Sequence, residues 1–340
     1  MRRAARLASL LVLLLLTPAC APSGPAGASG TPGGAEASGT STGSAAAPEA
    51  PATPPAPGPA DPPASAGAPE PPEDAEDALV IEVAHVGGFS TPEWLAARLP
   101  LVSVHADGRV ITQGPQIEIF PPPALPALQV QRVDRDAVAV LVDRALRAGV
   151  GESSDLGSPP VADLPSTRFT VVTPEETVVR EVYALGAGTP SGPGGPPGEP
   201  PTGPGSGLTA EQLAARAELQ SLVRELSDPA SVLPGDAVGE QEVYVPEAVA
   251  GVVTEWRDPQ DGRERRPVPW PGPPLPGEPL EPRLGLSCVV ATGEQARAVL
   301  DAAGSADTQT PWLSEDGERW SVTFRPLLPH EEGCGDLADW

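Results

Sequence analysis

Apolar and polar residues alternate with a period of two in Leu79–Ala84 and Arg319–Leu327, the pattern of β-strands that bury one face. Extended or β-rich runs predict further strands in Leu101–Ala106, Arg109–Gln113, Gln116–Phe120, Leu128–Val133, Arg168–Thr173, Thr177–Ala184, Glu247–Trp256 and Leu286–Ala291. In Arg319–Leu327, the side chains of Trp320, Val322 and Phe324 share one face. Asp107-Gly108 stands between two such runs and predicts a tight hairpin, because both central residues of that turn need positive φ.

Helical signals interrupt the strands. Thr91-Pro92-Glu93 has the chemistry of a helix start before Trp94–Leu99, and Asp134 can cap a helix that runs to about Ala148. Thr209 and Gln212 form a capping box for a further helix, and Gly293–Ala303 predicts another. This order of elements predicts an α+β fold, with small antiparallel or mixed sheets and a few packed helices.

Proline and glycine divide the chain into regions. The sequence has 48 Pro and 37 Gly among 340 residues, concentrated in three tracts, and the first of them has too few apolar residues to form a core. We therefore predict a signal peptide at 1–19 and a disordered, acidic Pro/Ala/Gly/Ser tether at 20–77. An α+β domain is expected at 78–230, with a disordered loop at 186–207. A smaller α+β unit is expected at 240–335, with an exposed Pro-rich loop at 257–285.

The first 20 residues have the features of a bacterial export signal. Three arginines precede the apolar stretch Leu7–Leu16, which is shorter than the roughly 20 residues that span a bilayer. Thr17-Pro18-Ala19-Cys20 resembles a lipobox, although Thr17 and Pro18 depart from its usual pattern. The resemblance implies that Cys20 is acylated, for instance with palmitate, and becomes the mature N-terminus. The alternative is an ordinary secretory signal that leaves Cys20 as a disulfide partner.

Charge narrows the classes of partner. The formal net charge is −25, and the sequence has neither Lys nor Asn, so all of its fixed side-chain cations are Arg. Lysine-dependent catalysis is therefore excluded. Such an acidic chain is repelled by phosphate backbones, so we expect no nucleic-acid partner. The expected membrane contact is the N-terminal lipid.

Four stretches carry a family resemblance: GFSTPEW, ADGRVITQGPQIEIFPPPALP, SCVVATGEQA, and TPW followed by RPLLP. They are similar to an uncharacterised family of actinobacterial secreted lipoproteins, over most of residues 78–335. The resemblance implies an extracytoplasmic location and a two-part layout. It implies no activity.

The remaining cysteines, Cys288 and Cys334, stand in a region that we expect to be exported. If Cys20 is acylated, these two form an even pair, and a disulfide is favoured. On the chain-entropy account it would stabilise the fold by roughly 4 kcal/mol. The alternative is a metal site that adds His330, but the sequence has no CxxC or HxxxH spacing to support it.

The histidines and tryptophans give weaker signals. His85 and His105 fall on strands that could be neighbours, so a titrating or metal-binding pair has to be weighed against ordinary partial burial. Trp94, Trp256 and Trp320 are expected in the core. Trp270 stands in the Pro-rich tract, where it either contacts a partner or packs back on the domain; Trp312 and Trp340 stand outside the expected core elements.

No motif for catalysis, phosphate binding or dinucleotide binding occurs in the sequence. We therefore predict no catalytic, cofactor or metal residues. The favoured hypothesis is a lipid-anchored extracytoplasmic envelope protein that binds a ligand or another envelope protein. The alternatives are a hydrolase-type envelope enzyme, built on a pair of Asp or Glu side chains, and a solute-binding lipoprotein.

Overall fold

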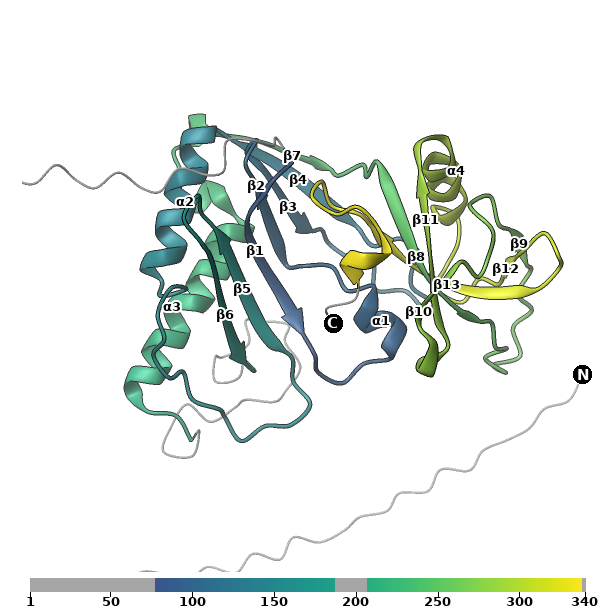
Figure 1. The fold of residues 1–340 in the computed structure, drawn as a ribbon, viewed down its shortest axis with the longest axis horizontal. Coiled ribbons are helices and arrows are strands. Elements are labelled where there is room, and N and C mark those ends of the chain that lie inside the picture. Colours follow the sequence, from purple (N-terminus) through teal and green to yellow (C-terminus); the bar gives the residue numbers. More distant parts are fainter. Residues whose placement is uncertain (1–76, 187–206, 338–340) are drawn as a thin grey trace, which may run out of the picture. The chain divides into compact units, whose positions relative to one another are not determined.

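A computed structural model describes residues 77–186 and 207–337. Within these ranges the chain forms two sheets, with strand orders β6-β5-β1-β2-β3-β4-β7 and β10-β11-β8-β13-β12-β9 (Figure 1). The strands are β1 Leu79–Val86, β2 Val102–His105, β3 Arg109–Gln113, β4 Leu128–Val133, β5 Ser166–Val172, β6 Thr177–Tyr183, β7 Val238–Val243, β8 Ala248–Glu255, β9 Val268–Pro269, β10 Glu278–Glu281, β11 Leu286–Thr292, β12 Trp312–Leu313 and β13 Arg319–Pro326. The helices are α1 Pro92–Ala96, α2 Arg135–Arg147, α3 Ala210–Ser227 and α4 Gly293–Ala303.

The first sheet is wholly antiparallel, and α2 and α3 cover one of its faces (Figure 1). Phe169 of β5, Leu141 of α2 and Leu222 of α3 belong to one buried cluster. The valines of β1 and β2 that point the same way join it, since side chains alternate along a strand. Burial of these apolar side chains from water holds this layer together.

The second sheet is antiparallel except where β12 pairs with β9 in parallel. Its central strand β8 lies between β11 and β13, and α4 covers one face. Phe324 lies at ring-centroid distances of 5.5 Å from Trp312 and 6.2 Å from Trp270. The Pro-rich segment that carries Trp270 is therefore part of this core.

The structure confirms the α+β fold class, with sheets of seven and six strands. The capping box of Thr209 and Gln212 is present, and a hairpin joins β2 to β3, as expected. Its turn differs from the predicted two-residue form, because Gly108 has positive φ and Asp107 does not. The first sheet draws on residues 79–243 and the second on residues 248–326. No described helix meets the length and apolarity needed to cross a membrane. The expectations for residues 1–76 and 187–206 lie outside the described residues.

Two local predictions are wrong. Residues 116–120 do not form a strand, because β3 already pairs with β2 on one side and with β4 on the other. The tract 257–285 is not simply an exposed loop, since it contains β9 and β10. The alternation pattern also missed β7, because its side chains are mostly exposed and polar.

Gly108 should be the least replaceable turn residue of the first sheet. Its φ is +89°, and an added Cβ would lie 2.0 Å from the carbonyl oxygen of Val133. Gly317 has a similar φ of +87° but open space around it. We expect Gly317→Ala to cost about 1 kcal/mol of unfolding free energy and Gly108→Ala more than about 2 kcal/mol. Denaturant titration of both variants checks this, and equal losses would contradict the steric account.

Candidate functional site

A pocket of about 810 Å³ lies in the described part of the chain. It lies among α1, the loop 113–126, the ends of β8 and β13, and Leu284. α1 itself lies against β8 (Figure 1) because Ala96 and Ala97 are buried with Ala250 and Val252 of that strand. This volume is within the usual range of small-molecule sites, roughly 300 to 1,000 Å³.

The pocket combines apolar and polar walls. Trp94, Ile117 and Leu284 contribute apolar surface and remain 49%, 66% and 50% exposed. Hydroxyl groups come from the strands, where Thr254 of β8 pairs with Ser321 of β13. The charged residues that line it are Glu93, Arg98, Glu255 and Arg257.

Arg98 is fixed by backbone atoms. Its Nη1 donates to the carbonyl oxygens of Gly87, at 2.7 Å, and of His85, at 3.4 Å. Partial burial lowers the pKa of Arg98 from its usual value. Among the described residues neither Arg98 nor Arg257 forms an ion pair, and neither do Glu93 and Glu255. The pocket therefore holds two arginines that no carboxylate of the described residues neutralises at contact distance.

A second polar cluster lies on the face of the first sheet opposite α2 and α3. Glu82 and Ser103 are cross-strand neighbours on β1 and β2, and His105 follows two residues after Ser103. His330 belongs to the segment after β13, and its Nε2 lies 3.9 Å from Oε2 of Glu82. The ring centroids of His330 and His105 are 5.3 Å apart. Ser103 Oγ, His105 Nε2 and His330 Nδ1 are buried without a hydrogen-bond partner in the described structure.

Burial shifts the pKa values of this cluster in opposite directions. It raises the pKa of Glu82 to about 6, helped by the nearby Glu331 and opposed by Arg325 and Arg168. It lowers the pKa of His330 to about 4, with His105 and Arg325 adding to the effect. At neutral pH the cluster therefore holds an ionised Glu82 and a neutral His330. Ser103 and His105 are fully buried, so a substrate would have to displace the covering segment to reach them.

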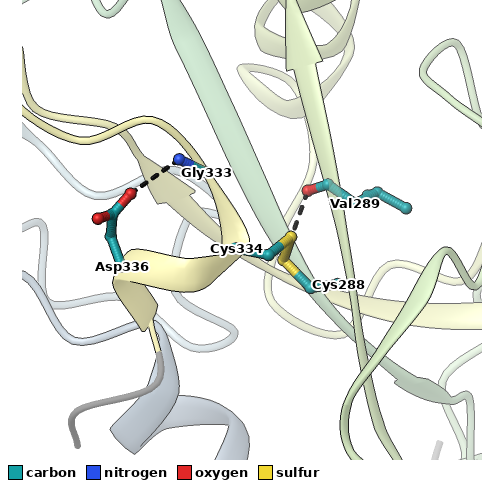
Figure 2. Close-up of a disulfide and its surroundings, with 5 residues drawn as sticks. All are labelled: Cys288, Val289, Gly333, Cys334 and Asp336. Carbon is teal, nitrogen blue, oxygen red and sulfur yellow. Dashed lines mark hydrogen bonds between the residues drawn. A yellow bond between two sulfur atoms is a disulfide. The ribbon is translucent and has the colours of Figure 1, made fainter.

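The covering segment, Leu327–Leu337, is held at both ends. Arg325 Nη2 donates to Glu331 Oε1 at 2.5 Å, and both side chains are 5% exposed. Cys334 and Cys288 form a disulfide, with 2.04 Å between the sulfur atoms, as the sequence analysis expected (Figure 2). Gly333 N donates to Asp336 Oδ2 at 2.8 Å and shapes the turn that carries Cys334 (Figure 2).

The structure separates the other residues of interest. His105 lies beside His330 and pairs across the strands with Leu79, so it is not opposite His85. Trp94 is half exposed, against expectation, because α1 buries its alanines instead. Trp270 packs back on the domain, and its Nε1 donates to Pro273 O at 2.6 Å. Cys20 and Trp340 lie outside the described residues.

Sequence reasoning did not find the pocket or the buried cluster. Both bring together residues from distant strands and loops, whereas motif searches need fixed spacing. The alternation of side chains on β1 and β2 could have shown that Glu82 and His105 lie on the same face of the first sheet, opposite α2 and α3. In the described part of the chain no group of three or more His, Cys, Asp or Glu side chains could hold a metal ion.

Comparison with protein-family models, with curated proteins and with solved structures finds no match to this chain.

The buried cluster should make stability depend on pH with two opposite contributions. Glu82 has a raised folded-state pKa, so its contribution to stability is present below pH 4.5 and is lost as pH rises through about 6. His330 has a lowered pKa, so its contribution is present above pH 6.5 and is lost as pH falls towards about 4. Between pH 4 and 7, the free energy of unfolding of the wild type should fall by about 2 kcal/mol relative to that of Glu82→Gln. Over the same pH range, the free energy of unfolding of the wild type should rise by about 3 kcal/mol relative to that of His330→Gln.

Urea unfolding of the three proteins at several pH values measures both differences. The comparison is internal, because substitution costs that do not depend on pH cancel from each slope. If the stability difference between wild type and variant changed with pH in the same direction for both variants, the opposite pKa shifts of Glu82 and His330 would be contradicted.

Proposed function

We propose that this chain is a lipid-anchored binding protein of the cell envelope, exposed on the extracytoplasmic face. Its N-terminal lipid on Cys20 holds it to the membrane, and the 810 Å³ pocket beside α1 binds the ligand. The pocket is the observation that carries the binding proposal. It combines exposed Trp94 and Ile117 with hydroxyl groups and charged side chains, the composition expected of a ligand site.

The disulfide supports the location. Bonds such as Cys288–Cys334 form and persist in oxidising compartments and are rare in the cytosol. The basic start, the short apolar stretch and the lipobox-like Ala19-Cys20 support the same location from the sequence. The resemblance to actinobacterial secreted lipoproteins agrees with both.

The pocket favours a small ligand over a flat protein contact. Its walls come from several elements, so they form an open concavity and not a single flat face. The solute-binding alternative and the leading proposal therefore converge on the same site. The buried cluster around Glu82 offers less for an enzyme, since Ser103 and His105 have no exposed surface.

The anchor has a direct test. Cys20→Ser removes the thiol to which a lipid would be attached, so we expect the variant to leave the membrane fraction while the wild type stays in it. Mass spectrometry of the wild-type N-terminus should show an acylated Cys20. A variant that stays in the membrane fraction as firmly as the wild type would contradict the anchor.

The pocket can be tested with a neutral fluorescent probe, N-phenyl-1-naphthylamine. We expect saturable binding to the wild type and at least about a fivefold weaker affinity in Trp94→Ala, since an aromatic side chain covered by a ligand contributes about 1 kcal/mol or more. Phe89→Ala is the control, because Phe89 is 88% exposed and does not line the pocket. Equal losses in both variants would contradict a site at the pocket.

A further inference from the structure

The charged side chains of the pocket differ in how firmly they are held. Arg98 is partly buried, and two backbone carbonyls fix its Nη1. The carbonyls engage one guanidinium nitrogen, and no hydrogen bond to the other two is found among the described residues. Arg257 is exposed and forms neither a hydrogen bond nor an ion pair within the same residues. Arg98 is thus the pre-organised cation of the pocket, and Arg257 is the less constrained one.

The surroundings of Arg98 limit the anion that it can bind. Glu93 and Glu255 line the same pocket, and the whole chain carries a net charge of −25. Carboxylates nearby repel a ligand of high negative charge, such as a polyphosphate. A guanidinium fork pairs well with a single carboxylate through two parallel hydrogen bonds. These constraints favour a ligand with one negative charge.

The rest of the pocket requires an apolar body on that ligand. Trp94 and Ile117 leave apolar surface exposed to the pocket, and Leu284 adds to it. The loop of prolines at 122–126 supplies a further apolar wall. An acyl chain or an apolar peptide end would cover these surfaces.

We propose that the pocket selects apolar molecules that carry a single carboxylate, with Arg98 as the residue that binds the carboxylate. This inference rests on the proposed function, since it assigns a ligand class to the same pocket. Trp94 and Ile117 bind the apolar body. Charge-assisted pairing with Arg98 then distinguishes the carboxylate from a neutral molecule of the same shape.

Decanoate and 1-decanol test this directly, because they share a ten-carbon chain and differ in the head group. Each is titrated as a competitor of N-phenyl-1-naphthylamine on the full-length exported protein. We expect decanoate to compete at least about tenfold better, since a hydrogen bond to a charged group contributes about 1.5 to 3 kcal/mol. A second pair, N-acetyl-Leu-Leu with a free or an amidated C-terminus, distinguishes a peptide end from an acyl chain as the source of the carboxylate.

Substitutions of the pocket arginines show which side chain is responsible for the preference for decanoate over decanol. Arg98→Gln should bring the decanoate-to-decanol ratio close to one while the probe itself still binds, which shows that the pocket is folded. Arg98→Lys keeps the charge without the fork and should give an intermediate ratio. Arg257→Gln should change the ratio less than Arg98→Gln. Arg224→Gln is the control, since Arg224 lies on α3 and does not line the pocket.

The outcomes separate this inference from the proposed function. If the probe binds at Trp94 but neither carboxylate competes better than its neutral partner, the ligand class is wrong and the binding pocket stands. A preference that survives Arg98→Gln and disappears in Arg257→Gln overturns the role of Arg98. If the probe does not bind at all, the proposed function itself fails.

Discussion

The ion pair between Arg325 and Glu331 is the constraint on which the described structure depends. An interior charge that loses its partner costs several kcal/mol, so each of these side chains requires the other. Glu331 also accepts a hydrogen bond from Leu328 N at 2.7 Å. The pair therefore fixes the path of the chain directly after β13. Leu327 joins the buried cluster of β8 and β11, while Leu328 packs with Ile111 of the first sheet.

The same segment creates the unusual electrostatics of Glu82. Without residues 327–337 over it, this face of the first sheet would expose Glu82 and His105 to water, and their pKa values would be ordinary. Covered, the face places a carboxyl and two imidazoles in a region of low polarity. The disulfide at Cys334 keeps the cover in place from its far end (Figure 2). The pKa shifts of Glu82, His105 and His330 thus result from the packing of residues 327–337 on the first sheet.

Local chemistry was readable from the sequence, and packing between distant segments was not. Thr209 acts through Gln212, three residues away, so the cap could be predicted from its neighbours. The composition of Asp107-Gly108 predicts a chain reversal, but the close approach of Gly108 to Val133 could not be predicted. Trp94 could not be placed, because its exposure depends on which side of a five-residue helix faces β8. Arg325 reads as an outward-facing strand residue, and only the return of the chain at Glu331 explains its burial. The disulfide was predictable because the number of cysteines is known without knowing how distant segments pack.

The pocket follows from the same packing. Ala96 and Ala97 are small enough to let α1 approach β8, and this approach brings Trp94 and Arg98 to the rim of the cavity. Arg98 is then held by carbonyls of the turn after β1, which are dipoles without net charge. Arg180 and Arg216 are likewise held by backbone carbonyls, but Arg98 is the arginine held in this way that lines the pocket. At the rim of a cavity the effective dielectric constant is lower than in bulk water, so an anion gains more from the charge of Arg98 than from a fully exposed arginine.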